Sequence, residues 1–309
     1  MNTWRPRLSL HAALMGSMLT VASADAATYT VIIAGLGGEP EYEQRFRQQA
    51  AAIAAAAEKV AGNPAHVLTL AGDRARRDSV RREFKELATR MTAEDVVTIV
   101  LIGHGSYDGD EYRFNVPDVD LTATDLSRLF DELPAKEQLI VNATSASGAT
   151  VERWQRPQRV IITATKSGGE RIATRFAQHW TQAVTTGAAD VNKDEVVTAA
   201  EAFDYATQQV AVTFKSDVAL ATEHSRLEGD NPARFTVARL GTAATAPTDP
   251  QVTALLSQRG DIERDLDAVK ARRGALSEDA YYDELEAVLV RLARLQKEID
   301  ARVGSGATE

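Results

Sequence analysis

The stretch DVVTIVLIGHG, residues 95–105, is an almost continuous run of β-branched and aliphatic residues that ends at glycine and histidine. Because apolar side chains occupy successive positions, both faces of such a strand must be buried. A strand of this kind is typical of the centre of a parallel sheet that has helices on each side. The stretch therefore predicts an α/β fold with a mainly parallel sheet.

Similar segments occur on both sides of this stretch. Short apolar runs bounded by turn residues predict further strands at residues 28–38, 65–72, 137–145 and 159–168. The segments between them predict helices at residues 42–62, 76–91, 124–133 and 169–184. Strands that alternate with helices in this way form a three-layer αβα sandwich. We assign this domain to residues 28–241.

The C-terminal part of the chain has a different pattern. Residues 242–250 are small or proline, which predicts a linker. Beyond it, apolar residues recur every seven positions or alternately every three and four, at Leu255, Ile262, Val269, Leu285, Val288, Leu292, Leu295 and Ile299. This spacing predicts a helical hairpin of coiled-coil type over residues 251–303. The hairpin either packs on the main domain or mediates oligomerisation or partner binding.

The first 26 residues have the pattern of a cleaved signal peptide. Arg5 and Arg7 precede the apolar stretch Leu8–Val21, and the small-residue motif Ala24-Asp25-Ala26 follows it. A membrane anchor is the alternative, but the apolar stretch is shorter than the ~20 residues that a spanning helix needs. We therefore expect export, to a bacterial periplasm, and no membrane span after the signal is removed.

Composition narrows the classes of ligand and chemistry. The net charge is −9, and basic residues do not cluster with aromatic residues, so we expect no nucleic-acid partner. The absence of cysteine excludes a thiol nucleophile and a thiolate metal site. Five histidines without an H-x-x-x-H pair argue against zinc. The sequence thus predicts no required cofactor.

Two predicted strand ends carry residues suited to chemistry. His104 follows one strand, and the hydroxyl-rich stretch TSASGAT, residues 144–150, follows the next. Ligands bind at the carboxyl ends of strands in open parallel sheets, so both ends are expected to border one crevice. Histidine is the usual proton-transfer residue near neutral pH. We expect His104 to act there, with substrate-binding positions at Gly105, Ser106, Ser147 and Gly148.

An apolar strand ending in His-Gly, then about 40 residues later one ending in Ala-Cys-x-Ser-Gly, is the two-block signature of the legumain and caspase group of cysteine peptidases. This chain resembles that group over residues 28–239. His104 matches the catalytic histidine of the group. The cysteine position corresponds to Ser145 when the downstream Ser-Gly is aligned, and to Thr144 when the strand is aligned without a gap. The resemblance implies a peptide or protein segment as ligand.

Replacement of the cysteine changes the expected activity. A hydroxyl is an effective nucleophile only when a base is hydrogen-bonded to it and a third group orients that base. Our leading hypothesis is a degenerate peptidase relative whose cleft binds a peptide without cutting it. One alternative is an active peptidase that uses Ser145, or Thr144, with His104. Another is an interaction scaffold that acts through the hairpin.

A second motif, DVNKDEVVTAAE, spans residues 190–201 with the spacing of an EF-hand loop. Its candidate calcium ligands are Asp190, Asn192, Asp194, the carbonyl of Val196, Thr198 and Glu201. Glu195 stands where the sharp turn favours glycine, so any calcium binding is expected to be weak. The alternative is that Thr198-x-x-Glu201 is the capping box of the following helix.

Overall fold

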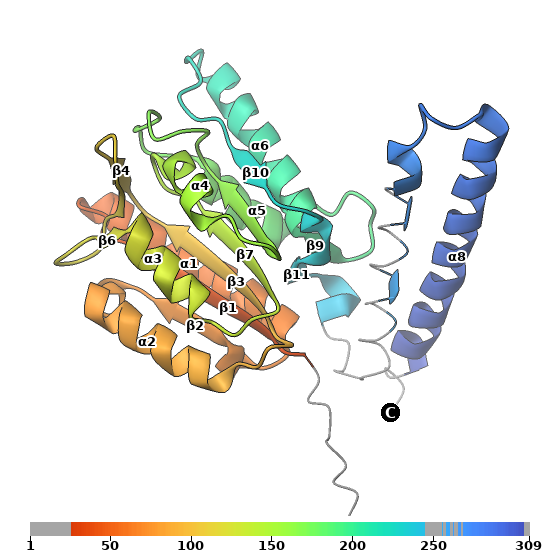
Figure 1. Cartoon of the computed structure of the whole chain (residues 1–309), viewed down its shortest axis with the longest axis horizontal. Coiled ribbons are helices and arrows are strands. Elements are labelled where there is room, and N and C mark those ends of the chain that lie inside the picture. The colour runs from red at the N-terminus through yellow and green to blue at the C-terminus, as the bar shows by residue number, and fades with distance from the viewer. Residues whose placement is uncertain are drawn as a thin grey trace, which may run out of the picture.

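The computed structural model describes residues 26–244, 255, 258–259, 262, 265–266 and 268–305. The predicted signal peptide, except Ala26, and most of the predicted linker lie outside these residues. The main domain contains a six-stranded sheet with the strand order β10-β8-β7-β3-β1-β2, which lies between two layers of helices (Figure 1). This arrangement confirms the predicted α/β fold with a mainly parallel sheet.

Five of the six strands are parallel, and the edge strand β10 (Arg226–Glu228) is antiparallel to its neighbour. The parallel strands are β1 (Thr28–Ala34), β2 (Val67–Leu70), β3 (Val96–Ile102), β7 (Glu137–Asn142) and β8 (Arg159–Thr163). In β3, Ile99 and Leu101 face one helical layer, whereas Val100 and Ile102 face the other, and all four are buried. The apolar run was therefore a reliable sign of a strand buried on both faces.

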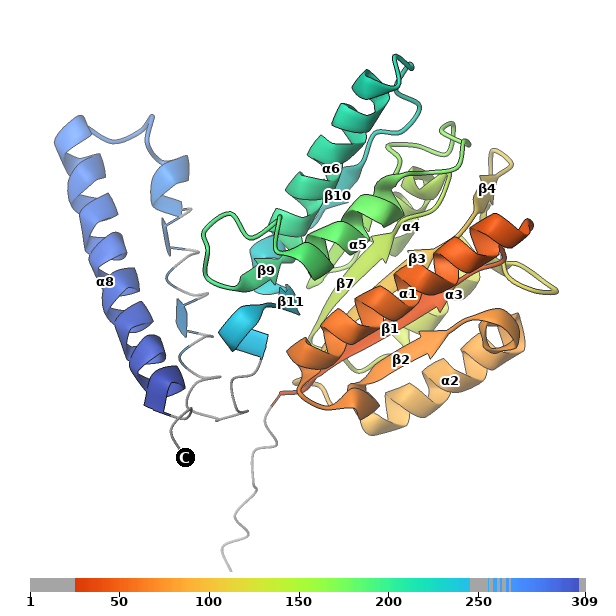
Figure 2. The ribbon, with the colours of Figure 1, turned by 180° about the vertical axis from the view of Figure 1, so that it is seen from behind.

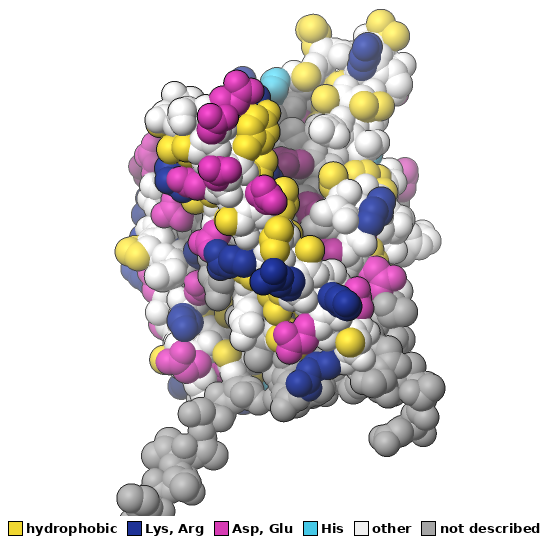
Figure 3. Space-filling model, turned by 90° about the vertical axis from the view of Figure 1, so that its right-hand side faces the viewer, with side chains coloured by type: hydrophobic (Ala, Val, Ile, Leu, Met, Phe, Trp, Pro, Cys, Tyr) yellow, Lys and Arg dark blue, Asp and Glu magenta, His cyan; other side chains and the backbone are white. Residues whose placement is uncertain are grey.

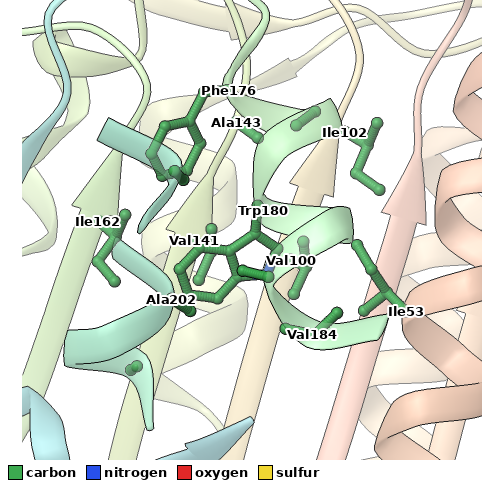
Figure 4. Packing of buried hydrophobic residues seen from close by; sticks show 14 of the residues in the cluster. Ile53, Val100, Ile102, Val141, Ala143, Ile162, Phe176, Trp180, Val184 and Ala202 are labelled. Carbon is green, nitrogen blue, oxygen red and sulfur yellow. The ribbon is translucent and has the colours of Figure 1, made fainter. Parts of the chain in front are cut away.

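Three helices cover each face of the sheet. Figure 2 shows one layer in front of the sheet, made of α1 (Pro40–Ala61), α5 (Phe176–Thr186) and α6 (Ala199–Ser216). The opposite layer contains α2 (Arg77–Arg90), α3 (Ala123–Asp131) and the short α4 (Val151–Trp154). Figure 4 shows the buried Trp180 of α5 beside Val141, Val184 and Ala202. Large side chains of this kind account for much of the free energy of burial.

The start of α5 differs from the sequence prediction. The helix begins at Phe176 rather than at residue 169, because the preceding segment is held in a loop by side-chain hydrogen bonds. Thr174 donates to the carbonyl of Ala143 at 2.7 Å, and the carboxylate of Glu170 accepts from the backbone of Lys166 at 2.9 Å. Such local bonds compete with helix formation and are not visible in periodicity.

Short connecting elements were missed by the sequence analysis, because strands and turns of two to four residues show no periodicity. A three-stranded antiparallel sheet contains β4 (Gly105–Tyr107), β5 (Tyr112–Phe114) and β6 (Leu121–Thr122). A separate pair consists of β9 (Val196–Thr198) and β11 (Thr236–Arg239). The 3-10 turns are η1 (Pro64–His66), η2 (Gly72–Ala75), η3 (Ser147–Thr150), η4 (Pro232–Arg234) and η5 (Gly241–Ala244).

The C-terminal hairpin has a hydrophobic cluster of its own. Its second helix is α8 (Glu278–Ser305), and the preceding segment, residues 255–271, is helical wherever the structure describes it. Six of the eight predicted seam residues form the buried centre of this cluster, namely Leu255, Ile262, Val269, Val288, Leu295 and Ile299, while Leu285 and Leu292 are partly buried and pack against it. Among the helices that the structure describes, none combines the length and the hydrophobicity needed to cross a membrane.

Candidate binding site at the carboxyl edge of the sheet

His104 lies two residues beyond the end of β3 and packs against α1. Its ring makes edge contacts with Tyr42 and Phe46, at centroid distances of 4.8 and 5.2 Å. Burial lowers the pKa of His104, and a hydrogen bond to the backbone of Gly37 opposes this shift. The imidazole is therefore neutral at pH 7, and one ring nitrogen donates to Gly37 while the other remains an acceptor.

A small pocket of about 40 Å³ lies beside His104. This volume accommodates a water molecule or one small side chain rather than a large ligand. The pocket is formed by α1, by the ends of β3 and β7, and by the start of α5, through Tyr42, Arg45, Phe46, Gln49, Gly103, His104, Ala143, Ala173, Thr174, Arg175, Ala177 and Gln178. It therefore occupies the sheet edge at which parallel α/β folds bind ligands.

Two polar side chains of α1 in this pocket have unused bonding capacity. Gln49 is only 8% exposed, and its Oε1 atom has no hydrogen-bond partner. The guanidinium of Arg45 stacks on the ring of Tyr42 at 4.3 Å, and no carboxylate in the described part of the chain pairs with it. An unsatisfied buried acceptor costs about 1–3 kcal/mol, so Gln49 indicates where a ligand donor would be stabilised.

Arg45 and Gln49 were not predicted as site residues, because they lie on a helix rather than at a strand end. A detectable signal was present. Gln49 is three residues after Phe46 and four before Ile53, on the buried face of an alanine-rich helix. A polar residue on the apolar face of a helix requires a partner, and that requirement marks it as a candidate functional residue.

Thr144 is fully buried, and its hydroxyl belongs to a hydrogen-bond network. It donates to Oδ1 of Asn142 at 2.8 Å and lies 2.6 Å from the phenol oxygen of Tyr112. Burial raises the pKa of Tyr112 to about 12, so the phenol stays protonated and donates to Thr144. The bonding capacity of the Thr144 hydroxyl is thus used within the protein.

The register of the sheet separates Thr144 from His104. The last pair of β3 and β7 is Leu101 with Asn142; continued beyond the strand ends, this register places Thr144 opposite Gly103, one position out of step with His104, and Ser145 opposite His104. Because successive residues of a strand point to opposite faces, this offset directs the two side chains to different layers. His104 contacts α1, whereas Thr144 contacts Tyr112, which belongs to the opposite hydrophobic cluster. No hydrogen bond of the described chain joins His104 to Thr144.

Ser145 follows immediately and is 2% exposed. Its carbonyl oxygen lies 3.1 Å from Thr144 Oγ1, and the chain then turns at Ala146, which has a φ of 56°. Within the described structure, no hydrogen bond links the Ser145 hydroxyl to His104. Neither candidate nucleophile therefore has the hydrogen-bonded base that a hydroxyl requires.

The predicted substrate-binding positions occupy two different environments. Ser147 is buried, and its hydroxyl accepts a hydrogen bond from the backbone of Thr165 at 3.1 Å. Gly148 is packed so tightly that a Cβ atom would lie 2.3 Å from the backbone of Lys166. Gly105 and Ser106 continue into β4, where Gly105 is half-buried and Ser106 is exposed. Ser147 and Gly148 thus connect the loops that follow β7 and β8.

The loop Asp190–Glu201 has several features that the sequence predicted. Glu195 has a left-handed φ of 63°, as expected for the position that favours glycine. Thr198 and Glu201 form a complete capping box at the start of α6. Burial raises the pKa of Glu201, and the nearby carboxylates Asp194 and Asp190 raise it further. Negative charge is therefore concentrated in this loop.

A positively charged side chain of the same protein, Arg259, lies next to these carboxylates. A guanidinium nitrogen of Arg259, in the hairpin, lies 2.9 Å from Oδ2 of Asp194. The described residues contain no group of three or more His, Asp or Glu side chains in a metal-binding arrangement. Asp194 is thus paired rather than open to a metal, and calcium binding at this loop stays a prediction.

Comparisons with known proteins add little beyond the fold. No family model matches the chain, and no curated protein matches it in sequence. Among solved structures, the crystal structure of protein GSU0716 from Geobacter sulfurreducens is similar with a TM-score of 0.44 and 11% identity. The match covers 68% of this chain and 97% of that one. A similarity at this level assigns no function.

Proposed function

We propose that this chain is a non-hydrolytic peptide-binding protein related to the legumain and caspase group of peptidases. The observation that carries the proposal is the position of the Thr144 hydroxyl, which is buried and bonded to Asn142 and Tyr112 on the face opposite His104. A hydroxyl without an adjacent base stays protonated and unreactive. In this proposal Thr144 supports the structure instead of catalysis, and Ser145 has no hydrogen bond to His104 in the described structure.

The chemistry of the pocket supports a peptide ligand. Arg45 offers donors, Gln49 offers an unpaired acceptor, and the neutral His104 offers a second acceptor. A peptide group or a carboxamide side chain supplies both an acceptor and a donor, and so complements this set. The small volume of the pocket favours one inserted side chain, with the rest of the peptide along the edge of the sheet.

A peptide library screened against the mature protein tests this proposal. Gln49→Leu removes the unpaired buried acceptor, so we expect unchanged or higher stability together with at least a tenfold loss of peptide affinity. Arg47→Ala is the matched control, because Arg47 lies on the same helix and pairs with Glu43 at the surface. Peptide binding that survives Gln49→Leu, or peptide cleavage that Ser145→Ala abolishes, would contradict the proposal.

Export is the second part of the proposal, and it rests on the order of Arg5, Arg7, the apolar stretch and the Ala24-Asp25-Ala26 motif. We expect the mature protein to begin at Ala27 or Thr28 in the periplasm. The intact mass of protein recovered from that compartment measures this directly. Retention of residues 1–26 in the exported protein would show that the segment is not a cleaved signal.

A second candidate function is self-association through α8. Tyr282 and Leu289 are 52% and 44% exposed. Because they are seven residues apart, they lie on the same side of the helix and form an exposed apolar stripe there. Figure 3 shows hydrophobic side chains in a stripe between acidic and basic side chains on this side of the molecule. Light scattering of the native chain and of a Tyr282→Glu/Leu289→Glu variant tests whether this stripe joins two copies.

A further inference from the structure

We propose that the loop Asp190–Glu201 is a docking socket for the C-terminal hairpin, and that the guanidinium of Arg259 is the group it binds. The loop lies between α5 and α6, and in both ribbon views it extends toward the helical segment that precedes α8 (Figures 1 and 2). The inference does not depend on the peptide pocket, which lies at the opposite, carboxyl edge of the sheet.

Arg259 is unusually buried for an arginine, with 6% of its surface exposed. Its guanidinium lies 2.9 Å from Asp194 and donates to Oε1 of Gln296, on α8, at 3.3 Å. It therefore connects both hairpin helices to the loop. Buried arginines are rare unless a carboxylate pairs with them, so this contact is specific.

The socket is organised around the carboxylate of Asp194. Its Oδ1 accepts from the backbone of Val196 at 2.8 Å, and its Oδ2 accepts from the amide of Asn192 at 3.0 Å. These bonds fix the orientation of the carboxylate, which reduces the entropy lost when a guanidinium binds. Arg239 of β11 is partly buried nearby, and its pKa is lowered by desolvation and by Arg259, whereas Asp194 opposes that shift.

Among the described residues, the hydrophobic cluster of the hairpin is separate from those of the main domain. Its buried apolar residues, and the partly buried ones packed against them, all belong to residues 255–299. The two clusters of the main domain contain no hairpin residue. We therefore expect the polar contact at Asp194 to contribute strongly to docking, and its loss should release the hairpin without unfolding either part.

The same geometry explains why the acidic loop needs no metal when the hairpin is docked. Asp194 is one of the predicted calcium ligands, and its outward oxygen already faces the guanidinium. An arginine and a divalent cation cannot occupy this position together. The acidic residues at EF-hand spacing therefore bind the side chain of Arg259 from the same protein.

Spin-label distances in the full mature chain test the proposal. The native sequence has no cysteine, so Val212→Cys on α6 and Ala287→Cys on α8, both exposed positions, give two unique labels. We expect a single narrow distance distribution for the native pair. Arg259→Gln should broaden it severalfold, and Asp194→Asn should do the same, with no further effect when the two are combined.

The matched control is Arg291→Gln, because Arg291 pairs with Asp265 at an exposed site within the hairpin, at 3.0 Å. Its distance distribution should match that of the native pair. Circular dichroism verifies that each variant remains folded. A distribution that stays narrow in both Arg259→Gln and Asp194→Asn would overturn the proposal, and so would equal broadening in Arg291→Gln.

Discussion

The hydroxyl oxygen of Thr144 and the phenol oxygen of Tyr112 lie 2.6 Å apart in the interior of the protein. Thr144 lies two residues beyond the end of β7, whereas Tyr112 belongs to the small antiparallel sheet that follows β3. The hydrogen bond therefore connects Thr144, the alternative nucleophile position, to a neighbouring structural element. We expect a hydroxyl in this setting to contribute to stability.

Loss of the hydrogen bond between Tyr112 and Thr144 should lower the stability of the protein measurably. Tyr112→Phe removes the donor to Thr144, and we expect the free energy of unfolding to fall by about 1–2 kcal/mol. Denaturant unfolding measures the change. Tyr107→Phe is the control, because its phenol donates to the backbone of Gly109 at an exposed site. Equal losses in the two variants would show that burial of the Tyr112 bond is unimportant.

Thiols introduced at the two candidate positions should react slowly. Thr144→Cys and Ser145→Cys place a thiol at residues that are 0% and 2% exposed, and no hydrogen bond described here supplies a base. We expect slower alkylation by peptide probes than for Ser106→Cys, which is exposed. Fast alkylation of Ser145→Cys that His104→Ala abolishes would instead reveal a preserved catalytic pair.

The stability of the protein should depend on pH through Glu223. Its buried carboxylate accepts from the backbone of Arg175 and of Phe176, both at 2.8 Å, and so caps α5. Burial raises its pKa from 4.5 to about 7. Because the folded pKa is above the unfolded one, this contribution is complete below pH 4.5 and is lost as pH rises through 7.

We therefore expect the native protein to lose up to about 3 kcal/mol of stability from this group between pH 4.5 and pH 8. Glu223→Gln should reduce the dependence, because the amide does not ionise. Melting temperatures at pH 5.5 and pH 8 measure this pH dependence of stability, and Glu58→Gln, at an exposed position, is the control. A pH dependence that is the same in native protein and Glu223→Gln would refute this assignment.

Gly105 should tolerate no side chain. A Cβ atom there would lie 2.4 Å from the carbonyl oxygen of Ser145 and 2.8 Å from Oγ1 of Thr144. We expect Gly105→Ala to destabilise the protein by about 1–3 kcal/mol through overpacking. Gly169→Ala is the control, since its nearest neighbour would be Oγ of Ser167 at 3.5 Å. Thermal denaturation should separate the two variants clearly.

The hairpin should be dispensable for folding of the sheet domain. Its hydrophobic cluster is separate from the two clusters of the main domain. A chain that ends at Ala244 retains the contact between the backbone of Ala243 and the carboxylate of Glu195. We expect this truncated chain to unfold cooperatively, as measured by circular dichroism. A molten or insoluble product would mean that the hairpin belongs to the main core.

Local patterns in the sequence predicted features that depend on a few neighbouring residues. The Thr198-x-x-Glu201 spacing indicated a capping box, and the position of Glu195 in the loop indicated a left-handed backbone; both occur. The start of α5 was wrong, because Glu170 and Thr174 form hydrogen bonds with residues that the periodicity does not reveal. Gln49 was missed because its unpaired state is defined by distant neighbours.

The sequence alone determined the parallel sheet, its two helical layers and the seam of the hairpin, because apolar periodicity reports directly which faces are buried. It also placed His104 and Thr144 at neighbouring strand ends. Only the tertiary structure decided that their side chains point to opposite layers, since a shift of one residue in strand register reverses every side chain. Likewise, the acidic loop could be read from its spacing, but its pairing with Arg259 depends on how the hairpin folds back.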